Sequence, residues 1–398
     1  MATFHRPITF LVWPIPQTTE KDMQPNNEGR PMTDFLLHRR ALLGAAALLP
    51  VGPALARVAR RPLRVTLLGQ SLIQQNLCAT GWSGQAALLA RLKIADAVFT
   101  DVETAIASPG AGAATRDGEV LHAAPPVVLD CLHRLGVTLV TTANNHAWDL
   151  GSDGIIGALA ELDARGIIHA GSGHDLATAS KAGWQRTPYG DVALVAAAAG
   201  AIRDGAAATP LRPGVNELRR SPSGMLDPDD VARNLDSIRS ARKQGATVIA
   251  CLHNHYWEPD PATTAEWQRS YARQCVDAGA AIFVAHGPPL LQGIERYKGA
   301  PLLHGLGSFI FQTRKASYAP RNWQSLMVEA HFRDGHFIDA HLTPLLLDSN
   351  RATPEAEFTQ GTPSIATGTN GHEVCANVAK LSAALGMTVA IERGSIKL

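Results

Sequence analysis

Residues 137–151 read VTLVTTANNHAWDLG, and this stretch decides the fold. An apolar run typical of a buried strand leads directly into Asn144, Asn145 and His146, and Asp149 follows three residues after the histidine. The sequence then changes to the period of an amphipathic helix. A strand followed by a helix is the repeating unit of α/β folds, and polar residues at the turn between them lie where such folds bind ligands.

The alternation of strand and helix continues on both sides of this stretch. Strands are predicted at 63–69, 95–100, 137–142, 191–199, 246–252 and 280–285, and helices at 85–92, 125–135, 153–165, 228–244 and 264–278. After Gly287 the helical period ends, and apolar segments up to residue 347 predict a further sheet of antiparallel strands. Residues 350–398 predict a loose linker, rich in Thr, Pro and Gly, with a C-terminal helix and strand. We therefore predict an α/β domain at 61–347 whose sheets pack together.

The composition is that of an ordinary globular protein. Of the 398 residues, 45% are hydrophobic, which is enough for a sizeable core, and the formal net charge is +1. A nucleic-acid binder that relies on electrostatics needs a basic stripe, and the sequence has none, so nucleic acid is not an expected partner. The five cysteines include no CxxC pair, which speaks against a cysteine zinc site and favours buried, apolar roles for most of them.

Residues 32–56 have the pattern of a twin-arginine export signal. Arg39 and Arg40 precede an apolar run that is too short to span a bilayer, and residues 54–56 form an A-x-A cleavage site. The mature protein is then expected in the periplasm or another extracytoplasmic compartment, with no stable transmembrane segment. An N-terminal helical hairpin is the alternative interpretation. Residues 1–31, which are polar and rich in proline, are expected to be a disordered extension or a misassigned start.

Polar side chains collect at the carboxyl ends of the predicted strands. Because parallel strands bring these ends to one edge of a sheet, side chains far apart in the sequence are expected to meet there. The residues are Gln70, Asp101, Glu103, Asn144, Asn145, His146, His253, His255 and His286. Imidazole, carboxylate and carboxamide groups are together the ligands of Zn²⁺, Mn²⁺ or iron, so the set predicts one or two divalent transition-metal ions.

Each cluster taken alone has a plainer explanation. A histidine at a strand end is commonly a hydrogen-bonded structural residue, and Asp101 with Glu103 fits a solvated turn. Asn144 would support a turn, and Asp149 would serve as a helix cap. Five further histidines are treated as non-catalytic: His122, His133, His169, His174 and His304. The coincidence of five polar clusters at five strand ends favours a site over these separate explanations.

Four segments carry a resemblance to a known family. They read ADAVFTDVETAI (95–106), TANNHAWDLGSDGI (142–155), HNHYWEP (253–259) and DAGAAIFVAHGPPLLQGIERYKGAPLLHGLGSFIF (277–311). Together they resemble the capsule-synthesis CapA family of poly-γ-glutamate biosynthesis proteins, within the calcineurin-like metallophosphatase superfamily. The resemblance implies a layered α/β/β/α sandwich of two mixed sheets flanked by helices. It also implies a role in making or handling an anionic exopolymer.

The resemblance implies roles for single residues as well. The expected metal ligands are Asp101, Glu103, Asn145, His253, His255 and His286. His146 is expected to act as the general acid that protonates a leaving group, with Asp149 fixing the tautomer of its ring. Gln70, Asn144 and Ser308 are expected to contact the substrate or to support the ligands.

Three positions depart from the family's pattern. Gln70 stands where the first strand carries a metal-binding Asp, Pro289 where a later motif has His, and Ser308 where the last motif has Asn. Loss of an anionic ligand and an imidazole is expected to weaken at least one metal position, although Asp101 or His255 offers a replacement. One metal, two metals in a rearranged set of ligands, and a degraded site all stay open.

Two functions of different classes follow. The first is an exported CapA-like metal-dependent hydrolase, in which metal-activated water attacks a phosphoester or a γ-glutamyl or related amide bond. The second is a non-catalytic accessory protein on the same fold, which binds the polymer or a capsule synthase component. An ordinary periplasmic phosphatase unrelated to capsule is a third interpretation. Metal analysis of the purified protein separates the first two.

Overall fold

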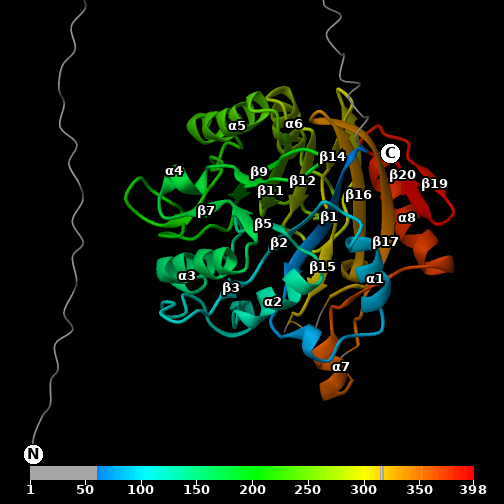
Figure 1. The fold of residues 1–398 in the computed structure, drawn as a ribbon, viewed down its shortest axis with the longest axis horizontal. Coiled ribbons are helices and arrows are strands. Elements are labelled where there is room, and N and C mark those ends of the chain that lie inside the picture. Colours follow the sequence, from blue (N-terminus) through cyan, green and yellow to red (C-terminus); the bar gives the residue numbers. More distant parts are fainter. Residues whose placement is uncertain (1–60, 314, 316–317, 351) are drawn as a thin grey trace, which may run out of the picture. The chain divides into compact units, whose positions relative to one another are not determined.

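The computed structural model describes residues 61–313, 315, 318–350 and 352–398. The export signal predicted at 32–56 and the extension predicted at 1–31 lie outside these residues. Two mixed sheets form the centre of the described chain, and helices cover them (Figure 1).

The first sheet has ten strands and the second has six. The first runs in the order β19 (Ala390–Glu392), β20 (Ser395–Lys397), β17 (His336–Leu347), β16 (Gln324–Arg333), β1 (Leu63–Leu72), β2 (Ala97–Val102), β5 (Leu139–Thr141) and β6 (Ile168–Ala170). Off this path, β15 (Ser308–Phe311) pairs with β1, and β18 (Pro363–Ile365) pairs with β17. The second runs β13 (Ile294–Tyr297), β14 (Ala300–Leu303), β12 (Ile282–His286), β11 (Thr247–Asn254), β9 (Val192–Ala199) and β8 (Gly183–Gln185).

The helices follow the sequence periodicity closely. They are α1 (Gln85–Leu92), α2 (Val127–Arg134), α3 (Gly151–Ala164), α4 (Leu176–Ala179), α5 (Pro228–Lys243), α6 (Glu266–Asp277), α7 (Pro354–Thr359) and α8 (Gly368–Ala383). At the start of α5 the Asp227 side chain accepts from two backbone N–H groups, and Pro228 occupies the first turn, so the sequence itself marks this boundary. Among the described helices, none combines the length and the apolar character needed to cross a bilayer.

The main apolar core lies between the two sheets. Leu67 and Phe99 from the first sheet and Leu194, Ile249 and Val284 from the second belong to one buried cluster. A second cluster joins the outer face of the first sheet to α1 and α2, and a third joins the outer face of the second sheet to α5 and α6. Each sheet is therefore buried on both faces, and the predicted α/β/β/α order is confirmed (Figure 1).

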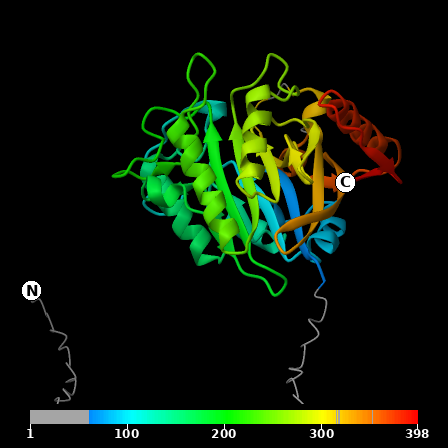
Figure 2. The same cartoon turned by 90° about the horizontal axis from the view of Figure 1, so that it is seen from above.

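The chain after Gly287 differs from the prediction in two ways. Its strands do not form a separate antiparallel sheet, because β16 and β17 extend the first sheet and β13 and β14 extend the second. The expected loose linker contains α7 and β18. β17 is 12 residues long, and β18 and β20 both pair with it. This pairing covers backbone groups that an unpaired strand edge would expose. The C-terminal elements lie at one end of the described chain, seen in red in Figure 2.

The carboxyl edges of the two sheets meet where the chain passes Gly287. In the first sheet β1, β2 and β5 are parallel, and in the second β9, β11 and β12 are parallel. Gly287 has φ +124°, and a Cβ there would lie 2.0 Å from the carbonyl oxygen of Asn254. Only glycine lets the chain turn this close to the end of β11, directly after His286.

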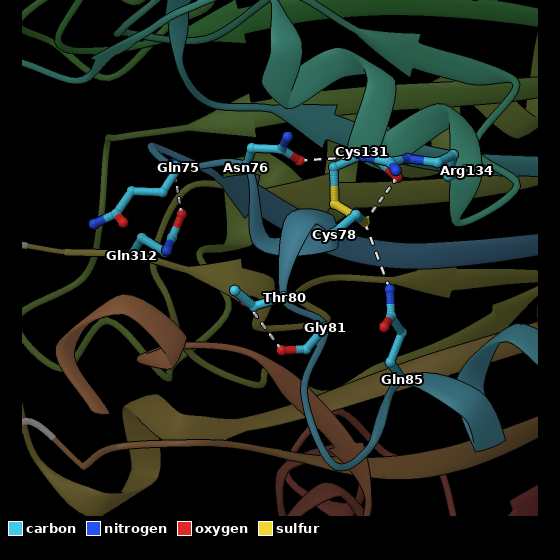
Figure 3. The surroundings of a disulfide bond; sticks show 9 residues. All are labelled: Gln75, Asn76, Cys78, Thr80, Gly81, Gln85, Cys131, Arg134 and Gln312. Carbon is cyan, nitrogen blue, oxygen red and sulfur yellow. Dashed lines mark hydrogen bonds between the residues drawn. A yellow bond between two sulfur atoms is a disulfide. The ribbon is translucent and has the colours of Figure 1, made fainter. Parts of the chain in front are cut away.

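A disulfide bond that the sequence did not reveal joins Cys78 to Cys131 (Figure 3). It connects the short 3-10 helix η1 (Leu77–Ala79) to α2. The other three cysteines, Cys251, Cys275 and Cys375, are buried thiols, which agrees with the apolar role predicted for most of them. The 53-residue separation of the bonded pair carries no recognisable pattern, so only the fold brings the two sulfur atoms together.

Replacing both Cys78 and Cys131 by Ser is expected to lower the free energy of unfolding by about 3–4 kcal/mol. The bond closes a loop across 53 residues and so restricts the unfolded chain. Urea unfolding of the variant and of the oxidised protein measures the difference. Thiol titration of the denatured, unreduced protein should count the three free cysteines. A count of all five cysteines before reduction would contradict the bond.

Candidate metal centre

The predicted site residues gather where the carboxyl edges of the two sheets meet. β1 and β2 bring Gln70 and Asp101 from the first sheet, and β11 and β12 bring His253 and His286 from the second. The turn after β5 adds Asn145. All of these side chains are buried. Parallel pairing places His253 directly beside His286 on neighbouring strands.

His253 joins the two sheets at the centre of the site. Its Nδ1 lies 2.7 Å from Oδ2 of Asp101, and its Nε2 lies 2.9 Å from Oδ1 of Asn145. Asn144 supports this arrangement, because its Nδ2 donates to Oδ1 of Asp101 at 2.9 Å and to the carbonyl of Val102 at 2.8 Å. The contact of Nδ1 with Asp101 fixes the orientation of the ring, and Oδ1 of Asn145 lies beside Nε2.

Glu103, His253 and His255 form a group that fits a metal ion. One ligand atom from each lies within 4.8 Å of the others, and Oε1 of Glu103 is 3.7 Å from Nε2 of His253. Atoms that bind one ion at about 2.1 Å lie roughly 3–3.5 Å apart, so small side-chain adjustments suffice. Within the described chain, Oε2 of Glu103 and Nε2 of His255 are buried without a hydrogen-bond partner. Buried polar atoms of this kind call for a ligand, and the donors suit a divalent transition metal.

Asp101 was predicted as a metal ligand, but in the structure its carboxylate contacts other protein groups. Both of its carboxylate oxygens already contact protein groups, one from Asn144 and one from His253. A carboxylate behind a histidine fixes the ring and its tautomer and makes the outer nitrogen a better ligand. Asp101 is therefore suited to positioning His253 rather than to binding a metal directly.

His286, Ser308 and Gln70 form the other half of the site. Both ring nitrogens of His286 and the hydroxyl of Ser308 are buried with no hydrogen-bond partner among the described residues. Gln70, by contrast, is hydrogen-bonded: its Oε1 accepts from the N–H of Gly287 at 2.8 Å, and its Nε2 donates to the carbonyl of Gly287 at 3.2 Å. A carboxamide can donate and accept at once, whereas a carboxylate cannot donate. Gln70 thus joins the two sheets instead of offering an anionic ligand.

His146 lies beside this group, and its ring contacts Asp149. Its Nδ1 is 2.8 Å from Oδ2 of Asp149, and its backbone N–H donates to Oδ1 of Asn144 at 3.1 Å. The same oxygen of Asp149 accepts from the backbone N–H of His122 at 2.9 Å. The ring of His122 packs against that of His146 with centroids 4.1 Å apart. The contact at Nδ1 leaves Nε2 as the atom of His146 that can exchange a proton.

Burial shifts the pKa of nearly every titratable group in the site. It raises the pKa of Asp101 to about 7, against the opposing effect of His286 and of the Asn144 hydrogen bond, and raises the pKa of Glu103 well above its ordinary value. Burial lowers the pKa of His253 to about 3 and that of His146 to about 2, the latter with a further contribution from Arg116. The imidazoles are therefore neutral at pH 7, and the carboxyl groups tend to hold protons when no cation is present.

Sequence reasoning missed two arginines in this region. Nε of Arg116 lies 2.7 Å from Oδ1 of Asp149, and Nη2 of Arg203 lies 3.0 Å from the same oxygen. Arg116 follows β3 (Ala105–Ile106) in a loop, and Arg203 follows β9 in another. Both loops are rich in Gly and Ala and have no periodic pattern, so nothing in the sequence pointed to either residue.

Comparisons with known proteins identify relatives of this chain. The uncharacterized protein y4sH of Sinorhizobium fredii is 28% identical over 61% of this chain and 65% of its own. The PGA biosynthesis protein CapA of Bacillus subtilis is 30% identical (56% and 54%), and the capsule biosynthesis protein CapA of Bacillus anthracis is 26% identical (55% and 50%). The chain thus spans less than two thirds of the length of these relatives.

Among solved structures, a 5'-nucleotidase precursor from Thermus thermophilus is similar with a TM-score of 0.40 and 12% identity, covering 83% of this chain and 61% of that one. The family model for the bacterial capsule synthesis protein PGA_cap matches residues 64–313, which is more than half of the chain and contains every predicted site residue. The chain belongs to the bacterial capsule synthesis protein (PGA_cap) family.

Proposed function

We propose that this protein is an exported, metal-dependent hydrolase that acts in the synthesis or handling of an anionic exopolymer of the capsule or poly-γ-glutamate type. Family membership supports the exopolymer role. The group of Glu103, His253 and His255, with buried ligand atoms that lack protein partners, carries the proposal of a metal. The bond that is cleaved is a phosphoester or a γ-glutamyl or related amide.

The residues divide the chemical work among themselves. Glu103, His253 and His255 would hold the ion, with Oδ1 of Asn145 beside them as a neutral oxygen ligand. When bound, a divalent transition metal supplies Lewis-acid chemistry at the scissile bond and acidifies water. His146 exchanges the proton through Nε2, while Asp149 holds Nδ1 and keeps one tautomer in place. His146 is neutral in the resting protein, so it accepts a proton before it donates one to the leaving group.

A non-catalytic accessory protein that binds the polymer or a capsule synthase component is the second candidate function. The observation that favours it is Gln70, a neutral side chain that is hydrogen-bonded to Gly287 and offers no anionic ligand. The two carboxylate oxygens of Asp101 likewise contact Asn144 and His253. A site with fewer anionic ligands than predicted is compatible with binding as well as with catalysis.

Element analysis of the purified protein, combined with a screen of phosphoester and γ-glutamyl substrates, tests the proposal. We expect one or two tightly held transition-metal ions per chain and turnover that a chelator abolishes and added metal restores. Metal-free protein that stays folded and hydrolyses none of these substrates with Mn²⁺, Zn²⁺ or Fe²⁺ added would favour the accessory role instead.

The proposal that the protein leaves the cytoplasm is supported by the disulfide bond, whereas the twin-arginine pathway rests on the sequence of the signal alone. A disulfide bond such as Cys78–Cys131 persists in oxidising, extracytoplasmic compartments and is rare in the reducing cytosol. Replacing Arg39 and Arg40 by Lys should leave the precursor in the cytoplasm, as shown by fractionation. Undiminished export of that variant would contradict this pathway.

Metal affinity is expected to rise with pH between 6 and 8, by about tenfold per pH unit for each proton that the ion displaces. Burial raises the pKa of Asp101 to about 7 and raises the pKa of Glu103 well above its ordinary value, so protonation of these carboxyl groups competes with metal binding as the pH falls through 7. His253, with a pKa of about 3, does not compete. Calorimetry at pH 6, 7 and 8 measures the slope.

The variant Asp101→Asn is the matched comparison for this pH dependence. It removes one titrating group, so the slope should become shallower, and it disturbs the tautomer of His253, so affinity should fall about 10–100-fold. An affinity that is flat from pH 6 to 8 in the unmodified protein would contradict the raised carboxyl pKa values.

A further inference from the structure

Asp149 is a single buried carboxylate that two arginines share. Arg116 and Arg203 both approach its Oδ1, at 2.7 and 3.0 Å, and the side chain of Asp149 has no exposed surface. The whole side chains of Arg116 and Arg203 are 16% and 27% exposed, whereas Asp149 is fully buried. Both arginine side chains therefore reach the surface from this carboxylate, and Arg203 is the more accessible of the two.

The charges in this group do not balance. Guanidinium groups stay protonated in proteins, so the two arginines and one carboxylate together carry an excess positive charge. The two cations also repel each other, since burial and the proximity of Arg116 both lower the pKa of Arg203. An anion that binds here would relieve the repulsion.

The positive group adjoins the metal cluster directly. Arg116 also donates from Nη2 to the backbone carbonyl of Asn145, and its charge affects the pKa of both Glu103 and His255. A substrate group held on this guanidinium thus has its neighbouring bond close to the metal ligands and to Nε2 of His146.

Both arginines are fixed in place before any ligand arrives. Arg203 donates from Nη1 to the carbonyl of Thr115 at 2.6 Å, and its guanidinium lies over the ring of Trp148 at 5.3 Å. Thr115 in turn donates its N–H to the carbonyl of Asp149 at 2.8 Å. A guanidinium has five N–H donors, and the contacts described here use only part of them on each arginine. The remaining donors suit the paired oxygens of a carboxylate or phosphate.

We propose that Arg116 and Arg203 form the receptor for the acidic group of the substrate, a carboxylate or phosphate oxyanion, next to the metal centre. This inference rests on the proposed function for the identity of the substrate. The binding of an anion by the two arginines does not depend on that function. Asp149 then has two tasks: it orients His146 through Oδ2 and holds the two arginines through Oδ1.

Calorimetric titration with glutarate and, separately, with inorganic phosphate tests the receptor on the full protein, both chelator-treated and metal-loaded. We expect salt-sensitive binding of at least one probe to the metal-free protein, weakened roughly 10- to 100-fold in Arg203→Gln and in Arg116→Gln. Arg203→Lys should lose less affinity, because it keeps the charge. Preference for glutarate indicates a carboxylate substrate, and preference for phosphate indicates a phosphoester.

Arg165→Gln is the control, because Arg165 pairs with Asp130 and Glu161 away from the site. If Arg116→Gln fails to fold, the more exposed Arg203 decides the question. Unchanged affinity in Arg203→Gln, or no binding of either probe to the unmodified protein, overturns the receptor. Arginine-dependent binding without any hydrolysis would overturn the hydrolase and leave the receptor standing. Hydrolysis with a KM that Arg203→Gln does not change would overturn the receptor and leave the hydrolase standing.

Discussion

Replacement of His253 by alanine is expected to reduce the metal bound to the purified protein by more than tenfold. The ring of His253 lies between Asp101 at Nδ1 and Asn145 at Nε2, and it belongs to the cluster with Glu103 and His255. Its removal deletes one donor and also frees Asp101 and Asn145 from the positions in which the ring holds them. Of the changes considered, this one affects the most contacts in the centre. Element analysis after gel filtration measures the effect.

The exposed His133 provides the matched control, because His133→Ala removes an imidazole from the surface of α2 without touching the site. His253→Gln is a second variant that keeps hydrogen-bonding capacity and so separates loss of metal from loss of fold. If folded His253→Ala or His253→Gln protein retains the full metal content of the unmodified chain, the proposed centre is wrong.

The arrangement of strands and helices could be predicted because it depends on local patterns. The period of apolar residues located β9, β11 and β12 as buried strands, and the cap at Asp227 with Pro228 located the start of α5. The meeting of the polar residues also follows from a general rule, since parallel strands share a carboxyl edge. What remained open was how the second sheet packs on the first.

The individual contacts could not be predicted, because they depend on that packing. Whether Asp101 faces a metal or the ring of His253 is set by the position of β11 opposite β2, which no local pattern records. The roles of Gln70 on Gly287 and of Arg203 on Asp149 each join residues from separate strands or loops. The sequence therefore placed several polar residues at one edge but missed Arg116 and Arg203, and the fold shows which side chains contact which.

Replacement of His146 by alanine is expected to lower turnover by roughly 10²–10⁴-fold while leaving metal content nearly unchanged. The ring contacts Asp149 through Nδ1 and has no place among the clustered ligands Glu103, His253 and His255. Its loss removes the group that exchanges a proton at Nε2, but it leaves every atom of that cluster. Steady-state kinetics on the substrate identified by the screen, with element analysis of the same sample, measures both quantities.

The exposed His174 is the control for this variant, since His174→Ala should change neither turnover nor metal content. His146→Gln tests the same role with a side chain that forms hydrogen bonds but cannot exchange a proton near neutral pH. It should be nearly as inactive as His146→Ala, because holding the substrate without moving a proton is not enough. If either variant loses most of its metal, His146 is a ligand; if His146→Gln keeps full turnover, the ring does not move the proton.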